Sequence, residues 1–431
     1  MNIKVIPLLP LILGGYLPFP AVSQTVSYPM TEVGSLRTGK VGSSSADSLS
    51  ADGSVVAGQA ENDAGNMHAF RWIASSGMSD LGTLKADDSG ESGAYALSAD
   101  GNVMAGGAEN DAGNMHAFRW IASSGMSDLG TLRTNNSSGS SVAYALSADG
   151  SVVAGQADND AGNMHAFRWI ASSGMIDLGT LKADDSGESV ANALSADGNV
   201  MAGGAENDTG DLHAFRWTMR SGMIDLGTLK ADDSGRSEAR AVSADGSVVA
   251  GQADNDAGNG HVFRWTMRSG MIDLGTLKAD DSGESEARAV SADGGVVAGV
   301  SENDTGDLHA FRWTTSSGMI DLGTLKADDS GESEARAVSA DGSVVAGLAE
   351  NDTGDLHVVI WKITPPPVVI PPAGTTTPPP VVIPPTGTTI PPAGTTTPPP
   401  VVIPPTGTTT PPAGTTTPPP VVIPPTGTTI P

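Results

Sequence analysis

The chain repeats one histidine–tryptophan signature seven times. Its His residues are spaced by 48 or 49 positions, and each is followed four residues later by a Trp. The seven His residues are His68, His116, His165, His213, His261, His309 and His357. Because every His and every Trp belongs to the repeat, each unit is expected to be a small supersecondary structure that buries its apolar faces against neighbouring units.

Each unit contains four short segments separated by turn signals. In the second unit they span residues 94–98, 102–106, 116–121 and 126–132, with Asp-Gly or Ser-Gly pairs in the tight turns. Such pairs supply the positive φ that hairpins need, so consecutive segments should pair antiparallel. The predicted fold is therefore all-β, a seven-bladed β-propeller of seven ~48-residue four-stranded repeats. An open β-solenoid is the alternative, although its coils are usually shorter.

The phase of the repeat predicts how the ring closes. A Leu-Gly-Thr-Leu motif follows each of the first six His segments, whereas its counterpart for the seventh, Val-Gly-Ser-Leu at 33–36, precedes the first full unit. We therefore expect residues 30–37 to form an N-terminal strand beside residues 357–363 that closes the last blade. Closure of this kind removes an exposed sheet edge, and a solenoid gives no reason for it.

The two ends of the chain are expected to lie outside the propeller. Residues 1–23 combine one Lys, an apolar run and a small-residue Ala-Val-Ser end, a pattern typical of a signal peptide. Residues 365–431 hold 25 of the 30 prolines and no charged or aromatic residue. That composition favours a disordered polyproline II linker or stalk. The predicted domains are thus a signal peptide (1–23), a propeller (24–364) and a Pro/Thr-rich low-complexity segment (365–431).

Composition and motifs exclude several classes of function. The chain has 22 basic and 49 acidic residues, and a net charge of -27 argues against nucleic-acid binding. Without cysteine there is no thiol nucleophile, disulfide framework or zinc ribbon. No membrane span is expected beyond the signal peptide. No hydrolase, zinc-protease or nucleotide-binding motif occurs, so we assign no catalytic residue and no cofactor and expect a non-enzymatic protein.

The repeated His, Trp and Arg side chains are interpreted as structural. One His per blade would be too far from the next to share a metal ion, so His and Trp should pack or hydrogen-bond between blades. The Arg that precedes each of the first six Trp residues is expected to pair with nearby carboxylates. Tyr95 and Tyr144 stand where later units have Asn192 or Arg, a departure that could mark asymmetric function and is equally well explained by drift. No private polar cluster near the axis is therefore expected.

The third segment and its continuation resemble the HAF repeat of bacterial extracellular proteins. The His-Ala-Phe triplet occurs at 68–70, 116–118, 165–167, 213–215 and 309–311, whereas residues 261–263 and 357–359 depart from it. The resemblance implies export and a repeat architecture, with no established activity. A repeat region followed by a Pro/Thr-rich linker also resembles the layout of bacterial autotransporters, but their barrel is absent from the sequence up to Pro431.

Acidic loops are the strongest candidates for a binding surface. In a four-stranded meander, the loop between the second and third strands and the connector to the next blade emerge on the same face. Both are long and acidic here, whereas the opposite face has only tight turns. The candidate partner-binding residues in two of the units are Asp208, Asp211, Asp232, Asp233, Asp304, Asp307, Asp328 and Asp329. These oxygens could bind Ca²⁺, but the spacing matches no complete Ca²⁺ loop, so a solvated acidic surface is the favoured interpretation.

These features predict an exported, non-enzymatic interaction or adhesion module, extracellular or on a bacterial cell surface. Its partner would be a protein or glycan on a cell surface, bound through the acidic loop face, and the propeller would be a monomer. A secreted hydrolase with a site in the propeller channel is the alternative.

Overall fold

A computed structural model describes residues 33–39, 42–135 and 138–363. The chain divides into two units, Met1–Pro366 and Pro367–Pro431. The predicted signal peptide and the Pro/Thr-rich segment lie outside the described residues. Within those residues, no helix is long and apolar enough to cross a membrane.

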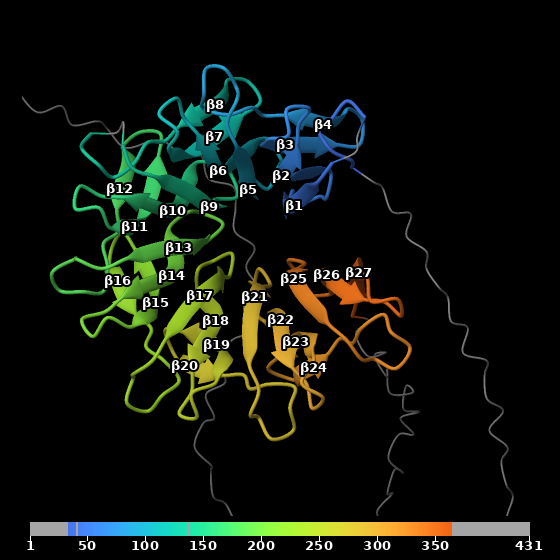
Figure 1. Cartoon of the computed structure of the whole chain (residues 1–431). Helices are drawn as coiled ribbons and strands as arrows, with labels where there is room; N and C mark the ends of the chain where they lie inside the picture. The colour runs from blue at the N-terminus through green and yellow to red at the C-terminus, as the bar shows by residue number, and fades with distance from the viewer. Residues whose placement is uncertain (1–32, 40–41, 136–137, 364–431) are drawn as a thin grey trace, which may run out of the picture. The chain divides into compact units, whose positions relative to one another are not determined.

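Seven antiparallel sheets are arranged around a common axis, which confirms the predicted seven-bladed propeller (Figure 1). Six sheets have four strands in sequence order, and the last has three, β25-β26-β27. Within each sheet the first strand lies innermost, next to the axis. The innermost strands are β1 (Ser44–Leu49), β5 (Ser92–Leu97), β9 (Ser141–Leu146), β13 (Ser189–Leu194), β17 (Ser237–Val242), β21 (Ser285–Val290) and β25 (Ser333–Val338).

The other three positions of each blade follow outward from the axis. The second strands are β2 (Val55–Glu61), β6 (Val103–Glu109), β10 (Val152–Asp158), β14 (Val200–Glu206), β18 (Val248–Asp254), β22 (Val296–Glu302) and β26 (Val344–Glu350). The third strands are β3 (Met67–Ile73), β7 (Met115–Ile121), β11 (Met164–Ile170), β15 (Leu212–Thr218), β19 (Gly260–Thr266), β23 (Leu308–Thr314) and β27 (Leu356–Lys362). The outer strands are β4 (Gly77–Asp80), β8 (Gly125–Asp128), β12 (Gly174–Asp177), β16 (Gly222–Asp225), β20 (Gly270–Asp273) and β24 (Gly318–Asp321).

Small and aromatic side chains on the second and third strands form the core between blades. Phe215 on β15 is fully buried and belongs to a cluster with Met201 and Trp217 of its own blade and Val152 of the preceding one. The same Phe is fully buried in six blades, whereas blade seven has Val359 there. Since both faces of a blade pack against neighbours, each blade contributes to two core layers.

Hydrogen bonds from the tight turns join successive blades. The Ala99 amide of the β5–β6 turn donates to the Ala148 carbonyl of the next blade at 2.9 Å, and such bonds link the turns of all seven blades in series. The six repeated arginines also cross this interface: Arg216 Nε donates to the Gly246 carbonyl at 3.1 Å. The prediction that these arginines pair with carboxylates was wrong. The main-chain carbonyl of the neighbouring turn is the acceptor that each guanidinium reaches.

The last blade departs from the predicted closure. We expected residues 30–37 to form its outer strand, but 33–37 are not a strand, and 30–32 lie outside the described residues. Thr38 N donates to Asp63 Oδ1 of the first blade at 2.8 Å, just as Ala86 N donates to Asp111 Oδ1 at the next junction. Residues 33–38 therefore occupy the place of a connector between blades, which explains why they form no strand.

The three-stranded sheet leaves its outer edge open within the described residues. Val358 and Ile360 on β27 are 70% and 51% exposed, and Leu49 on β1 is 59% exposed. The corresponding side chains in the middle of the series are buried or half-buried. Within the described residues, the first and last blades therefore lack the strand packing and turn bonds that join neighbouring blades at the six regular junctions.

Candidate functional site

A β-bulge on every innermost strand directs one side chain per blade toward the axis. In each first-to-second strand pair the register slips by one residue, leaving an extra residue between two alanines or between Ala and Ser. A bulge of this kind redirects its extra side chain and is frequent beside functional sites. The seven bulge residues are Asp47, Tyr95, Tyr144, Asn192, Arg240, Arg288 and Arg336.

Glycine on the second strand makes the bulge possible. A Cβ on Gly203 would lie 1.8 Å from the Val190 carbonyl oxygen, and the equivalent glycines of the other six blades face the same obstruction. The repeat thus keeps this glycine in all seven units and varies the bulge residue opposite it. The result is a uniform scaffold that presents a non-uniform ring of side chains.

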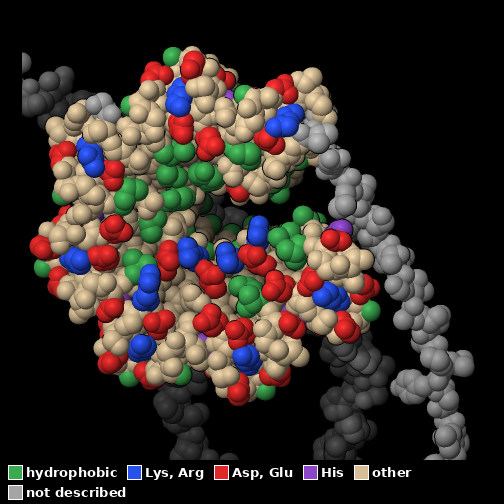
Figure 2. All heavy atoms as spheres, in the orientation of Figure 1, with side chains coloured by type: hydrophobic (Ala, Val, Ile, Leu, Met, Phe, Trp, Pro, Cys, Tyr) green, Lys and Arg blue, Asp and Glu red, His purple; other side chains and the backbone are tan. Residues whose placement is uncertain are grey.

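One half of the ring is aromatic. The Tyr95 and Tyr144 rings lie with centroids 6.4 Å apart at an angle of 31°, and Gln156 Nε2 donates to the Tyr144 hydroxyl at 3.0 Å. Burial raises the pKa of both phenols above the ordinary value. A Cβ on Gly93 would lie 2.7–2.9 Å from the Tyr95 ring, so glycine there lets the ring lie close to its own strand. Figure 2 shows hydrophobic side chains gathered over β5, β6 and β9.

The other half is a ladder of ion pairs. Each arginine of the ladder contacts a glutamate on its own strand, and two of them also reach the next strand. The ladder consists of Arg240–Glu238 (3.1 Å), Arg240–Glu286 (3.0 Å), Arg288–Glu286 (3.0 Å), Arg288–Glu334 (3.7 Å) and Arg336–Glu334 (3.3 Å). Asn192 Nδ2 donates a hydrogen bond to Glu238 Oε1 at 2.8 Å, so Asn192 extends the ladder by one blade. Figure 2 shows charged side chains of both signs aligned over β17, β21 and β25.

Asp47 is the bulge residue of β1, on the first blade of the ring. Partial desolvation raises the pKa of the Asp47 carboxyl although its side chain stays exposed, and the positive charge of Arg336 on the last blade partly opposes that shift. The Asp47 charge in turn contributes to the raised pKa of Tyr95, after burial. The ring of bulge residues therefore has an aromatic sector, an ion-pair sector and one carboxyl group, Asp47.

This ring corrects the expectation that no private polar cluster lies near the axis. Variation at the bulge was visible in the sequence as the change from Tyr95 and Tyr144 to Asn192 and Arg, but the sequence did not distinguish asymmetric function from drift. The signal missed was the position of the variation: it falls within the innermost strand, two residues before its end, and not in a loop.

The eight predicted acidic residues lie on the loop face, where their carboxylates hold the loops in place. Asp208 Oδ1 accepts a hydrogen bond from Ala183 N at 2.8 Å, which ties its loop to the preceding connector. Asp211 accepts from Thr209 Oγ1 at 2.8 Å, Asp232 from Ser234 N at 3.1 Å and Asp233 from Thr228 N at 2.9 Å. The second set, Asp304, Asp307, Asp328 and Asp329, repeats these bonds. Asp233 and Asp329 also have a positive φ of 58°, which Asp tolerates better than most residues.

Six of the seven repeated histidines are buried, which confirms a structural role, but their bonds to Asp and Asn lie within one blade and not between blades as we expected. His213 is 1% exposed; its Nδ1 lies 2.9 Å from Asp225 Oδ2, and its Nε2 lies 3.2 Å from Asn207 Nδ2. The hydrogen bond that His213 Nδ1 donates to the Asp225 carboxylate raises the pKa of His213, and burial opposes this shift. Six blades share the His–Asp pair within the described residues.

In four blades a second carboxylate approaches the His–Asp pair. His309, Asp321 and Asp329 each place one potential ligand atom within 4.8 Å of the others, and three further blades have the same group. Metal ions use such a donor set. In this structure His309 Nδ1 contacts Asp321 and the Asp329 carboxylate accepts the Thr324 N–H, so the group already forms an internal hydrogen-bond network.

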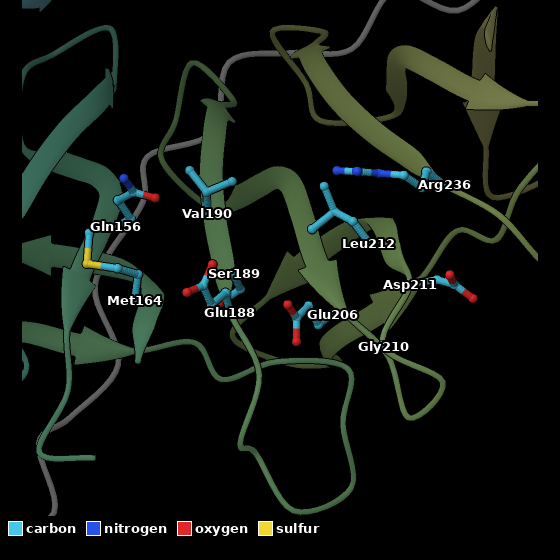
Figure 3. A pocket seen from close by; sticks show the side chains of 10 residues that line it. All are labelled: Gln156, Met164, Glu188, Ser189, Val190, Glu206, Gly210, Asp211, Leu212 and Arg236. Carbon is cyan, nitrogen blue, oxygen red and sulfur yellow. The ribbon is translucent and has the colours of Figure 1, made fainter. Parts of the chain in front are cut away.

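A cavity of about 420 Å³ opens between the third and fourth blades (Figure 3). Its walls combine apolar side chains of β11, β13 and β15 with charged side chains at the ends of strands. The lining residues are Gln156, Met164, Glu188, Ser189, Val190, Glu206, Gly210, Asp211, Leu212 and Arg236. Of the predicted residues, only Asp211 lines it.

Comparisons with known proteins show the fold and no family. The chain matches no protein-family model and no curated protein sequence. Among solved structures it is similar to a prolyl endopeptidase, with 12% identity and a TM-score of 0.53 over 74% of this chain and 48% of that one. At this identity the likeness shows a propeller architecture alone.

Two further structures are less similar. The β-propeller domain of the Trilobed protease from Pyrococcus furiosus, described as having an open velcro topology, shows 10% identity and a TM-score of 0.46, covering 74% of this chain and 95% of that domain. TolB from Acinetobacter baumannii shows 14% identity and a TM-score of 0.38, covering 61% of each chain. The chain thus spans less than two thirds of that TolB.

Proposed function

We propose that this protein is an exported, non-enzymatic binding module that adheres to a cell-surface protein or glycan through its acidic loop face. The observation that carries the proposal is the series of carboxylate-to-amide bonds that fixes this face. At seven junctions, a connector amide donates to a loop aspartate at 2.8–2.9 Å. Loops held in one conformation lose little entropy on binding, which favours affinity.

The charge of this face determines the partner's chemistry. The loop aspartates are exposed, and each blade repeats them at the same place, so the face offers regularly spaced negative charges. A partner with a cationic patch would be attracted, and the attraction should weaken with salt. The signal-like N-terminal sequence and the HAF-type repeat support export to the cell surface.

The experiment removes charge without removing hydrogen-bond acceptors. Seven Asp→Asn substitutions replace the junction aspartates Asp63, Asp111, Asp160, Asp208, Asp256, Asp304 and Asp352. Since Asn Oδ1 still accepts the connector N–H, the loops should keep their conformation. We expect salt-dependent binding to immobilised poly-L-lysine, measured by biolayer interferometry, and adherence to cultured cells to fall at least tenfold.

The opposite face supplies a matched control. Seven Asp→Asn substitutions in the tight turns, at Asp52, Asp100, Asp149, Asp197, Asp245, Asp293 and Asp341, remove the same charge and also keep a backbone-bonded acceptor. This variant should bind as the parent does. Equal losses in the two variants would show that net charge alone attracts the probe, and the proposed face would then be wrong.

The proposal assigns no cofactor, and Ca²⁺ provides a direct test. The oxygens that could bind Ca²⁺ already accept hydrogen bonds from the loops, so binding would have to break some of them. We expect titration calorimetry to give no heat with Ca²⁺. Saturable heat that disappears in the junction variant would instead favour a Ca²⁺-bridged partner.

A secreted hydrolase acting in the channel is the second candidate. The specific observation in its favour is the raised pKa of Asp47 beside Tyr95 and Arg336, since acid catalysis uses carboxyl groups of this kind. Release of chromophore from a panel of nitrophenyl glycosides and peptide nitroanilides would support it, provided that Asp47→Asn abolishes the release. No turnover across the panel would favour the binding module.

A further inference from the structure

The cavity between the third and fourth blades holds two opposite charges that the protein itself leaves unpaired. Within the described residues, neither the Arg236 guanidinium nor the Glu188 carboxylate has an ion pair or a side-chain hydrogen bond. By contrast, Glu206 in the same cavity pairs with Lys182 at 2.7 Å. Glu206 and Asp211 already have partners, so Arg236 and Glu188, both exposed, are the two charged groups of the lining that remain available to a ligand.

Arg236 breaks the repeat at this place. The equivalent position holds Glu91, Glu188, Glu284 and Glu332 in four other blades and Ser43 and Ser140 in the remaining two. A guanidinium therefore occurs only once in this ring of positions. An arginine recognises a carboxylate through two parallel hydrogen bonds, which a lysine or a neutral side chain cannot reproduce.

Apolar side chains lie between the two charges. In Figure 3 the Arg236 side chain extends toward Leu212, whereas Glu188 lies on the other side of Leu212, below Val190, and Met164 lies beyond Glu188. A purely anionic ligand would be attracted by Arg236 but repelled by Glu188, Glu206 and Asp211. A purely cationic ligand would be repelled by Arg236 and would leave the guanidinium without a counter-charge. The arrangement favours a ligand that carries both charges and an apolar body.

We propose that this cavity binds a small apolar zwitterion of the dipeptide type. The ligand's carboxylate would pair with Arg236, its ammonium with Glu188, and its side chains would pack on Val190, Leu212 and Met164. A volume of about 420 Å³ is in the range of ligand pockets. A second cavity of about 190 Å³ continues past Leu212 and Arg236, so a longer peptide would have room. The site is independent of the acidic-face proposal, because only Asp211 is common to both.

The test uses the full chain and three dipeptide probes in titration calorimetry. Leu-Leu carries both charges, N-acetyl-Leu-Leu lacks the ammonium, and Leu-Leu-amide lacks the carboxylate. We expect Leu-Leu to bind at least tenfold more tightly than either derivative, since each derivative loses one of the two charge-assisted contacts.

Two variants assign the binding to this cavity. Arg236→Glu introduces the residue that four other blades have at this position, so the fold should be retained, and Leu-Leu affinity should fall at least tenfold. Glu284→Ala alters the equivalent position of the sixth blade and should leave the affinity unchanged. The proposal is overturned if Leu-Leu does not bind, if the acetylated probe binds equally well, or if Arg236→Glu binds like the parent.

Discussion

The third strands of this propeller keep the same residues from blade to blade, whereas the innermost strands vary at the bulge position. On the third strand, six of the seven blades keep His, Phe, Arg and Trp at fixed positions, and Phe is fully buried in those six. On the innermost strand, the bulge residue is Asp, Tyr, Asn or Arg, and its side chain is half-buried or exposed. Repetition is maintained where blades pack on one another and is lost where they border the axis. Asymmetric function should therefore be sought where the repeat fails.

Truncation of a third-strand core residue should have the largest effect. Phe215→Ala should destabilise the protein by about 3–5 kcal/mol, because it leaves a cavity among fully buried neighbours. Tyr144→Ala on the innermost strand should cost roughly 1 kcal/mol, since that ring is half-buried and has one aromatic neighbour. Urea denaturation of both variants measures the difference, and equal losses would remove the distinction between the two strands.

Substitutions of two adjacent glycines on β14 should differ in their effect on stability, because one glycine supports the bulge and the other lies at a position that varies between blades. Gly203→Ala places a Cβ against a main-chain oxygen and should cost about 1–3 kcal/mol or more by disturbing the bulge. Gly204→Ala meets only the ends of Leu212 and Glu238 at 3.2 Å, and other blades have Gln, Val or Leu there. Its melting temperature should stay close to that of the parent. A comparable loss in both variants would contradict the role given to the bulge.

The pH dependence of stability should reveal the His–Asp pairs of the repeated layer. The folded-state pKa of His213 is raised above its ordinary value of 6.5 by Asp225. Its contribution is therefore complete below about pH 6.5 and is lost as pH rises through the higher folded-state pKa. Asp225→Asn keeps an acceptor but removes the charge, so its melting temperature should fall less than the parent's between pH 6 and pH 8. Parallel curves would show that the pair is not linked to protonation.

The ion-pair ladder should have the smallest effect on stability. Its arginine side chains are 42–59% exposed, so Arg288→Ala should change the free energy of unfolding by about 0–1 kcal/mol. High salt should reduce even that difference. A loss as large as that of Phe215→Ala would mean that the ladder is part of the scaffold, and the comparison would fail. Denaturation at low and high salt provides the measurement.

The repeated features were accessible from the sequence because each has seven copies. The 48-residue spacing, the Asp-Gly turns and the alternation around Phe118 predict blades, strand order and the side on which the acidic loops emerge. Single-copy features gave no such signal. Neither the free charge of Arg236 nor the bulge at Tyr144 follows from spacing, since both depend on how neighbouring blades approach each other. The partner of Arg216 was predicted wrongly because its acceptor is a main-chain carbonyl, and every residue of the sequence has one.

The turn-to-turn bonds form a line of six, from Ala51–Ala99 to Ala292–Ala340, and within the described residues no such bond joins the seventh turn to the first. A stack of units coupled only to nearest neighbours loses its terminal members first, much as a zipper opens from its ends. Amide hydrogen exchange should therefore be fastest in the blades of β1 and β25 and slowest in the blade of β13. The proposed binding cavity lies beside this middle blade. It should therefore be the part of the propeller that local unfolding disrupts last.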